Sequence, residues 1–428
     1  MEEVTRYLDG YERYGIGSWV DLRGELDLPD ADMDALGVLR ERLPSALRSY
    51  ALGRLSIDTT APPRYVPVSL PPDVRAAAWD DSKESAAGAL VTRECGPVAE
   101  YRAGMPLVMA RVAQRGARVQ LTVLGWHVVA DGRTVEGVYR IVAHVLDARV
   151  PLPADAPVPA FGQREAFAGN VSEADMVKPD EMWAALPRGR PAVPPLPASP
   201  APVNVLDYVR YRLAPVRDYA HTHGVGVQAL LMAAAVAAHR AYNEMAPDAP
   251  VVVDTAVDTR RSPFAAPAHA ARELYSGSAA MHTVVTAPSS INSVGDEEET
   301  EALIRHCHAV VRARQGTLSA PRVLTYMGST VDAATGRVCA ASAYPPLDCA
   351  PQVIVSNVGA YRYCMHPRLA VHRALGTGAY VAAVYAYADG AALELYVSHP
   401  STMDARLRDL IVRRLDDVLV RLCGSARV

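Results

Sequence analysis

A histidine and an aspartate four positions apart are the residues of this chain best suited to acid–base chemistry. His127 and Asp131 lie in the segment WHVVADG, which begins at Trp126. An imidazole has an unperturbed pKa of about 6.5, so it accepts a proton near neutral pH. Taking up a proton is what activates a hydroxyl or amine nucleophile. His127 is therefore our candidate general base.

Asp131 has two interpretations. Its carboxylate could be a second catalytic group, or it could hold the turn by pairing with an arginine. We favour the second, because a carboxylate beside a guanidinium stays ionised and gains two directed hydrogen bonds. That arrangement leaves His127 as the proton acceptor. Gly132 follows Asp131, and we expect it to supply a backbone geometry that other residues disfavour.

The flanking segments predict that His127 lies in a turn between a strand and a helix. Two apolar runs, 106–112 and 118–124, flank a short stretch that ends at Gly116, which predicts an antiparallel hairpin. After Gly132 apolar residues recur at the helical spacing of three and four. They are Val135, Val138, Tyr139, Val142 and Leu146. A turn at the edge of a domain presents its side chains to a substrate.

Two further elements are predicted before the hairpin. Residues 19–26 alternate apolar and charged side chains, as a half-buried strand does. A helix follows, for which we expect Asp32 as the cap and Pro44 as the point of interruption. Strand and helix thus open the fold.

The second half of the chain begins after a stretch rich in proline. Seven prolines fall within 187–202, which excludes a helix or a central strand there. Residues 216–245 then predict a pair of helices. We expect an N-terminal domain over 1–186, a linker or crossover over 187–204 and a C-terminal domain over 205–428. The strands and helices of both halves occur in a mixed order, which indicates an α/β protein.

Length and charge exclude several classes of partner. A chain of 428 residues is long enough for two or three domains of about 100–200 residues each. The formal net charge of -4 and the pI near 6.3 provide no global basic field for nucleic acid. The N-terminus lacks the pattern of a signal peptide, and no apolar stretch reaches the ~20 residues of a membrane span. We expect a cytoplasmic protein without a membrane span.

No metal site is expected from the cysteines and histidines. The six cysteines show no Cys-x-x-Cys spacing, which fits neither zinc nor a disulfide framework. His306 and His308 lie two positions apart, and on a helix such residues point in different directions. We interpret the thiols as reduced and mostly buried.

Residues 127–132 resemble the His-x-x-x-Asp-Gly motif of the chloramphenicol acetyltransferase-like superfamily. Members include BAHD acyltransferases, alcohol acetyltransferases, polyketide-associated acyltransferases and nonribosomal peptide condensation domains. The predicted context agrees, because the motif follows a strand, precedes a helix and is followed by a proline-rich crossover and a second domain.

Asp258-Thr259-Arg260 is similar to a downstream segment of the same superfamily, whose arginine pairs with the motif aspartate. The resemblance implies that Arg260 is the partner of Asp131. The alternatives are an arginine on the surface or a local pair with Asp258.

The segment 355–359 resembles a Ser-Asn-x-Gly segment near the active-site tunnel of alcohol acetyltransferase-like and condensation-like members. The resemblance implies that Ser356 or Asn357 donates a hydrogen bond to a developing oxyanion. Alternatively, the two residues form a turn between two strands.

The chain departs from the superfamily in two places. Many relatives have two adjacent histidines, and here Trp126 replaces the first, which changes the tunnel lining but keeps the base. The Asp-Phe-Gly-Trp-Gly motif of plant BAHD enzymes is absent, so a plant-like enzyme is disfavoured.

The resemblance implies a fold and an activity. The fold is α/β, with two similar mixed-sheet domains and an active-site tunnel between them. The activity is transfer of an acyl group from acyl-CoA to a small-molecule alcohol or amine, with His127 as general base and no tightly bound cofactor or metal. The alternatives are a condensation-type enzyme that takes its thioester from a carrier protein, and a noncatalytic binding relative of the same fold.

Overall fold

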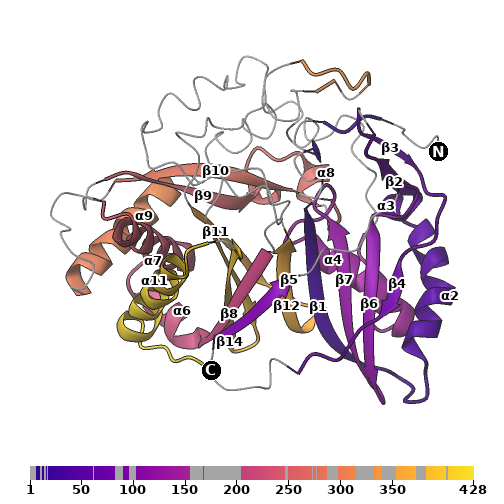
Figure 1. Ribbon diagram of the computed structural model, residues 1–428, viewed down its shortest axis with the longest axis horizontal. Coiled ribbons are helices and arrows are strands. Elements are labelled where there is room, and N and C mark those ends of the chain that lie inside the picture. Colours follow the sequence, from indigo (N-terminus) through magenta and orange to yellow (C-terminus); the bar gives the residue numbers. More distant parts are fainter. Residues whose placement is uncertain are drawn as a thin grey trace.

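The computed structural model describes residues 6–9, 12–13, 16, 18–60, 62–81, 90–95, 103–154, 167, 204–245, 249–271, 273–275, 277–286, 297–314, 331–332, 334–339, 353–372, 382–401 and 403–428. Two mixed β-sheets lie side by side, and helices cover the outer side of each (Figure 1). The α/β class and the two mixed sheets are as predicted. Apart from Asn204, the proline-rich linker lies outside the described residues.

The first sheet has five strands in the order β12-β1-β7-β6-β4. Their bounds are β12 (Met365–His372), β1 (Trp19–Asp27), β7 (Arg118–Trp126), β6 (Val108–Arg115) and β4 (Val74–Ala76). Of the neighbouring strand pairs in this sheet, β4–β6 is parallel and the others are antiparallel. The predicted strand over 19–26 and the predicted hairpin are both confirmed. Gly116 in the hairpin turn has φ +56°, which glycine adopts without steric cost.

The second sheet has seven strands in the order β10-β9-β11-β13-β14-β8-β5. Their bounds are β10 (Ser278–Val285), β9 (Val251–Asp258), β11 (Val353–Ala360), β13 (Ala382–Asp389), β14 (Ala392–Pro400), β8 (Asn204–Arg212) and β5 (Val91–Cys95). Strand β11 lies inside the sheet and runs parallel to both of its neighbours, β9 and β13. A separate ribbon pairs β2 (Leu55–Asp58) with β3 (Arg64–Pro67).

Helices pack on the outer face of each sheet. On the first sheet lie α2 (Ala35–Arg48) and α4 (Val135–Leu146), with the short α3 (Ala51–Arg54) beside them. Against the second sheet lie α6 (Leu213–Thr222), α7 (Val227–Tyr242), α9 (Glu297–Arg314) and α11 (Ala405–Asp416), which continues as a wider turn over Asp417–Leu422. Two short helical turns follow β9, at Thr259–Arg261 and at α8 (Pro267–Ala270). The helix predicted after Gly132 is α4, and the predicted helix pair is α6 and α7.

Helix α2 differs from the prediction at both ends. The N–H of its first residue, Ala35, donates to the side-chain oxygen of Gln114 at 3.0 Å, and the residue at the cap position is Asp34 rather than Asp32. The helix also continues past Pro44 to Arg48. Its buried face explains this continuation, because leucines follow one another at four-residue intervals on both sides of the proline. They are Leu39, Leu43 and Leu47, at most 1% exposed.

The two faces of the second sheet belong to different hydrophobic cores. On β13, Tyr385 packs with the core of the first sheet, whereas Val384 and Ala386 pack with the outer helices. This follows from the two-residue period of a strand. The ring centroid of Tyr396 lies 5.3 Å from that of Tyr208 and 4.8 Å from that of Tyr385. A layer of tyrosines thus joins the second sheet to the first.

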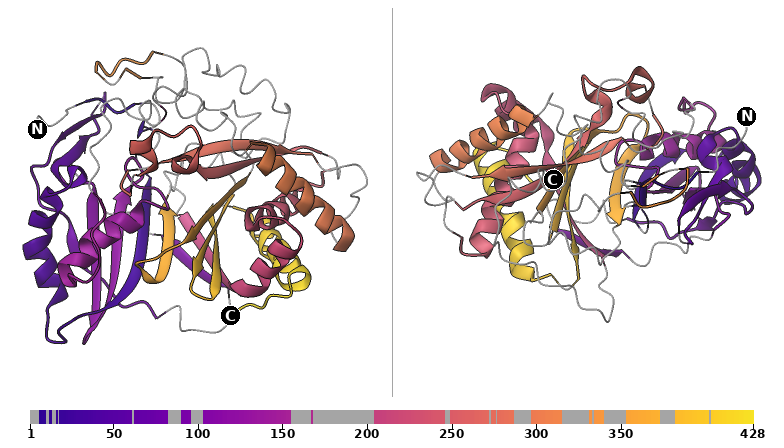
Figure 2. Two further views of the ribbon diagram at one scale, coloured as in Figure 1. Left: turned by 180° about the vertical axis from the view of Figure 1, so that it is seen from behind. Right: turned by 90° about the horizontal axis from the view of Figure 1, so that it is seen from above.

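The two halves exchange one strand each. β12 comes from the second half but pairs with β1 at the edge of the first sheet, and β5 comes from the first half but pairs with β8 at the edge of the second. Views from behind and from above place β12 between the halves (Figure 2). Most strands before 187–204 thus lie in the first sheet and most strands after it in the second, with β5 and β12 as the exceptions.

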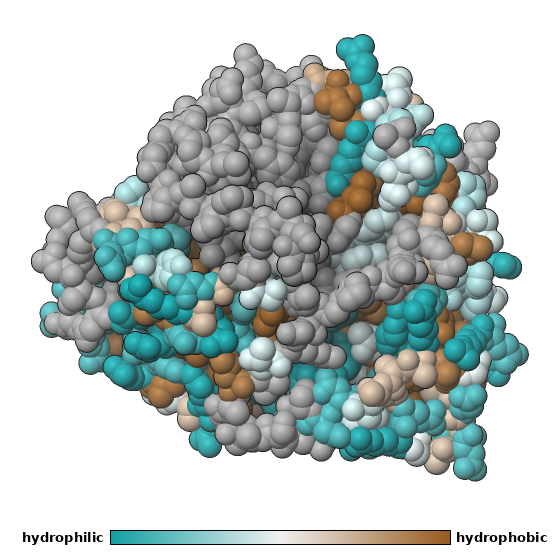
Figure 3. All heavy atoms as spheres, in the orientation of Figure 1, coloured by the Kyte–Doolittle hydropathy of each residue, from teal (hydrophilic) through white to brown (hydrophobic). Residues whose placement is uncertain are grey.

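No single helix among the described residues is long and apolar enough to span a membrane. Helices α6 and α7 reach the necessary length only together, and the pair is bent by 98°. In the view of Figure 1, hydrophilic side chains cover much of the described surface, and hydrophobic ones are scattered between them (Figure 3).

Candidate active site

His127 lies directly after β7, in residues 126–132, which we call the His127 loop. Its N–H donates to the carbonyl oxygen of Ser18 at 2.9 Å, which extends the pairing of β7 with β1 by one residue. The N–H groups of Val129 and Ala130 then donate to the carbonyl oxygen of Trp126 at 2.9 and 2.8 Å. His127 is partly exposed, whereas 128–131 are buried. The backbone thus holds the imidazole at the end of a strand.

Trp126, the residue before His127, lies in the core. Its side chain is 3% exposed, and its ring stacks on Trp19 with 5.4 Å between centroids and 3° between planes. The two residues face each other across β1 and β7. The stack fixes the last residue of β7 directly before His127.

Asp131 is buried and surrounded by hydrogen-bond donors. Its Oδ1 accepts from the N–H groups of Arg133 and Thr134 at 2.9 and 2.8 Å. Its Oδ2 accepts from the N–H of Gly277 at 2.8 Å and from Arg260 at 3.4 Å. Burial alone would raise the pKa of the Asp131 carboxyl, but the charge of Arg260 and the backbone donors outweigh it and hold that pKa well below its usual range. Asp131 therefore stays ionised.

Arg260 joins two carboxylates. Its Nη2 lies 3.4 Å from Asp131, and its Nε donates to Asp258 at 2.6 Å. The pair with Asp131 implied by the resemblance and the alternative local pair with Asp258 are thus both present. The side chain of Arg260 is only 8% exposed, and burial alone would lower the pKa of its guanidinium, but the two carboxylates raise it. The three residues link the His127 loop to the end of β9.

Gly277 is a site residue that the sequence analysis missed. Besides donating to Asp131, it accepts hydrogen bonds at its carbonyl from the N–H of Thr259 at 2.9 Å and from the Thr259 hydroxyl. A Cβ at this position would lie 3.1 Å from the side chain of Arg260. In the sequence, Gly277 is only a glycine before a strand. Nothing in that pattern indicates a hydrogen bond to a carboxylate far away in the chain.

Gly132 has a different role from the predicted one. Its φ is not positive, so the prediction of a special backbone geometry is wrong. The reason for glycine is space: a Cβ here would lie 2.9 Å from Cγ2 of Val358 on β11. The carbonyl of Gly132 accepts a hydrogen bond from the Tyr361 hydroxyl at 2.7 Å. Segments from the two halves of the chain therefore meet at Gly132.

Ser356 and Asn357 lie on strand β11, so the alternative of a turn between strands is wrong. Ser356 is buried and pairs with Tyr385 across β11 and β13. By the strand period it shares a face with Ile354, which packs in the core between the sheets. Asn357 is exposed, and its side-chain oxygen accepts from the N–H of Gly359 at 3.1 Å. Ser356 is thus the one of the two that faces the first half.

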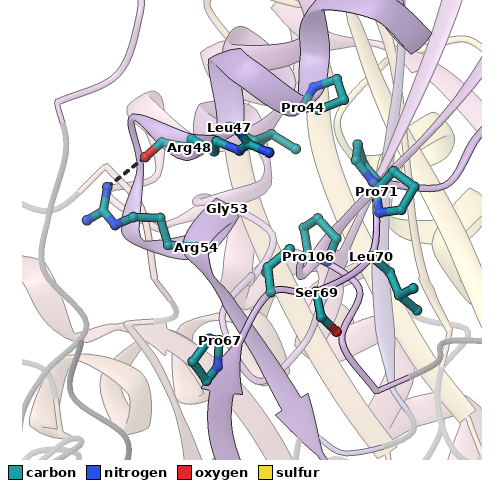
Figure 4. A pocket seen from close by; sticks show the side chains of 12 residues that line it. Pro44, Leu47, Arg48, Gly53, Arg54, Pro67, Ser69, Leu70, Pro71 and Pro106 are labelled. Carbon is teal, nitrogen blue, oxygen red and sulfur yellow. Dashed lines mark hydrogen bonds between the residues drawn. The ribbon is translucent and has the colours of Figure 1, made fainter.

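A cavity of about 540 Å³ lies elsewhere, at the end of α2. Its lining includes several prolines, Leu47, Leu70, Arg48 and Arg54, but no residue of the His127 loop (Figure 4). Arg54 donates to the carbonyl oxygen of Arg48 at 2.9 Å, which caps the helix end. Among the residues that line it there is no His, Cys, Asp or Glu, so we assign it no role in acid–base chemistry. In the described part of the chain, no group of three such residues could hold a metal ion.

Known protein families and curated proteins provide no match to the sequence. Solved structures do match. The trichothecene 15-O-acetyltransferase TRI3 from Fusarium sporotrichioides has a TM-score of 0.64 at 11% identity, over 98% of this chain and 95% of that one. F. graminearum TRI101, solved with coenzyme A and deoxynivalenol, has a TM-score of 0.59 at 12% identity, over 95% and 96%.

A third match is a condensation domain. The condensation domain of the monacolin K polyketide synthase MokA has a TM-score of 0.62 at 14% identity, over 98% of this chain and 97% of that one. All three likenesses extend over nearly the whole chain, and the two sheets with their helices account for them. The chain therefore has the two-domain chloramphenicol acetyltransferase-like fold that these acetyltransferases and condensation domains share.

Proposed function

We propose that this protein is an acyltransferase that moves an acyl group from a CoA thioester to the hydroxyl or amine of a small molecule, with His127 as general base. The fold is that of known acetyltransferases. TRI101, one of the structural neighbours, was solved with coenzyme A and deoxynivalenol, a thiol cofactor and a small molecule.

The observation that carries the proposal is the buried Asp131–Arg260 pair. Asp131 already accepts hydrogen bonds from backbone N–H groups and from Arg260. An ionised carboxylate with its oxygens occupied in this way is a poor proton acceptor. It serves instead to fix the His127 loop, and the partly exposed His127 is left as the base.

In the proposed reaction, His127 takes the proton of the acceptor hydroxyl or amine as that atom attacks the thioester carbonyl. A tetrahedral oxyanion forms. When it collapses, the carbon–sulfur bond breaks, and the departing thiolate takes the proton back from the imidazolium. A hydroxyl donor near the oxyanion would lower its energy, and Ser356, on the β11 face toward the first half, suits this role better than Asn357.

A carrier protein is the second candidate source of the thioester. The likeness to the MokA condensation domain is as extensive as that to the acetyltransferases. The chemistry at His127 would be the same, because the acyl group in both cases is a thioester. The two candidates differ in the surface that holds the thiol.

The test measures thiol release from a panel of acyl-CoA donors with pooled alcohols and amines. We expect acceptor-dependent release by the native protein, and a fall of about 100-fold or more in His127→Ala, the size expected for loss of a general base. His221→Ala, which changes an exposed histidine on α6, is the matched control and should leave release unchanged.

Release that does not change in His127→Ala would contradict His127 as the base. If neither protein releases thiol from any CoA donor, the same panel is repeated with acyl groups loaded on a phosphopantetheinylated carrier protein. Activity only in that arm favours the condensation-type alternative, and inactivity in both arms favours a noncatalytic relative.

A further inference from the structure

We propose that Glu136 is a positioning residue, which holds strand β11, and with it Ser356, in register with the His127 loop. The inference deepens the proposed function and rests on it for its catalytic consequence. Glu136 lies in the first turn of α4, one turn after Asp131.

The segment that Glu136 holds is the crossing from one sheet to the other. Strand β11, an interior strand of the second sheet, ends at Ala360, and β12 begins at Met365 on the edge of the first sheet. The chain passes between the sheets within 361–364. This crossing lies beside the start of α4, next to the His127 loop.

Glu136 accepts both of the central N–H groups of the crossing. Its Oε1 accepts from the N–H of Tyr363 at 2.7 Å and, at short range, from the N–H of Arg362. The side chain is buried, with 9% of its surface exposed. Hydrogen bonds to a carboxylate are about twice as strong as those between neutral groups.

Two further contacts hold the start of the same crossing. Arg133 donates from Nη1 to the carbonyl oxygen of Ala360 at 2.9 Å, and Tyr361 donates its hydroxyl to the carbonyl of Gly132 at 2.7 Å. Each of the four residues 360–363 thus bonds to the segment 132–136. Glu136 is the only carboxylate in this set of contacts and accepts two of the four bonds.

The usual reason for an acidic residue in a first helical turn is the helix dipole. That role requires only that the carboxylate lie near the helix N-terminus, in solvent if need be. Glu136 instead lies buried with two backbone donors from the other half of the chain. Its contacts therefore serve the placement of the crossing more than the stability of α4.

The link to chemistry is the last part of β11, which joins Ser356 to the crossing. Val358, two residues after Ser356, already touches Gly132. Beyond Val355 the strand pairs only with β13, so a crossing that moves away from α4 would shift the end of β11 and move Ser356 relative to His127. A displacement of about 1 Å between reacting groups costs about 100-fold in rate.

The experiment compares native protein, Glu136→Ala and Glu136→Gln, with Asp416→Ala as the control. Asp416 is a carboxylate on α11 that accepts from Tyr211 and Arg427, so its loss removes a similar number of bonds on the far side of the second sheet. Two quantities are measured: kcat and KM for the thioester, and amide hydrogen exchange over 126–132 and 353–363.

We expect kcat of Glu136→Ala to fall about 10- to 100-fold, as for a misplaced group, while KM changes less than about threefold. Exchange should rise in 360–363 and along β11. Glu136→Gln keeps an acceptor oxygen without the charge, so it should recover part of the lost kcat. Asp416→Ala should leave kcat and exchange in these segments at native values.

Unchanged exchange at 360–363 in Glu136→Ala would overturn the proposal whatever the activity does. Faster exchange with native kcat would overturn the positioning role while the proposed function stands. Hydrogen exchange can be measured without turnover. If no donor supports activity and the proposed function fails, the exchange data still test whether Glu136 positions β11.

Discussion

At the residue scale, Asp131 joins a turn in the first half of the chain to backbone in the second. Its charge is balanced by Arg260, and its oxygens are occupied by N–H groups from 133, 134 and 277. In the proposed mechanism, this explains why the carboxylate next to His127 is not itself the base. The contacts of Asp131 hold the His127 loop against Gly277 and Arg260.

We expect Asp131→Asn to lower the free energy of unfolding by about 2–3 kcal/mol at pH 7. Removing one partner of a buried pair typically costs about 3–5 kcal/mol, and the loss is smaller here because Arg260 keeps Asp258. Denaturant unfolding measures the difference. Asp81→Asn, in the exposed pair with Arg115, is the control and should change little.

The same variant gives a pH signature. The folded-state pKa of Asp131 lies below the unfolded value of about 3.9. The stability that its ionised carboxylate contributes is therefore fully present above about pH 3.9 and is lost as the pH falls below it. The native protein should therefore have a larger free energy of unfolding than Asp131→Asn at neutral pH, and this difference should shrink only below about pH 4. A difference that already vanishes at pH 6 would contradict the depressed pKa.

Gly132 gives a second residue-scale prediction. Gly132→Ala should destabilise the protein by about 1–3 kcal/mol, the usual range for overpacking, because the new Cβ meets Val358. Val358→Ala removes the atoms in the way, so Gly132→Ala should cost clearly less in that background. The full double-mutant cycle is measured by denaturant unfolding. Equal costs in both backgrounds would mean that backbone conformation, and not space, requires the glycine.

At the scale of elements, the sequence predicted what neighbouring residues decide. The hairpin, the turn at His127 and α4 follow from local periodicity and a glycine. The length of α2 does not follow from local periodicity, because burial of Leu39, Leu43 and Leu47 against the core overrides the local effect of Pro44. The partner of Asp131 came from resemblance, and that pair is present.

What the sequence could not predict are contacts between distant segments. Glu136 and Tyr363 lie 227 positions apart, and nothing in either segment indicates the other. Gly277 and Val358 touch the His127 loop for the same reason, because the fold of the second half brings them there. Periodicity places a residue on a face of its element, but it does not say which element covers that face.

At the scale of the whole molecule, the exchanged strands make each half incomplete without the other. The first sheet lacks β12 if only 1–186 are present, and the second lacks β5 if only 205–428 are present. The tyrosine layer adds apolar area between the sheets, since Tyr208, Tyr385 and Tyr396 are at most 4% exposed. Each of the two sheets is thus completed by a strand from the other half of the chain.

We therefore expect the chain to unfold in one cooperative transition. Loss of β12 exposes the unpaired edge of β1 and the face that carries Trp19 and Trp126, an aggregation-prone arrangement. Thermal unfolding followed by tryptophan fluorescence and by far-ultraviolet circular dichroism should give the same midpoint, since coincident probes mark a two-state transition. All four tryptophans, at 19, 79, 126 and 183, lie in the first half of the sequence, whereas the circular dichroism also includes α6, α7, α9 and α11 of the second half. Two separated midpoints would show that each half holds together alone, and the exchanged strands would then contribute little to the coupling between them.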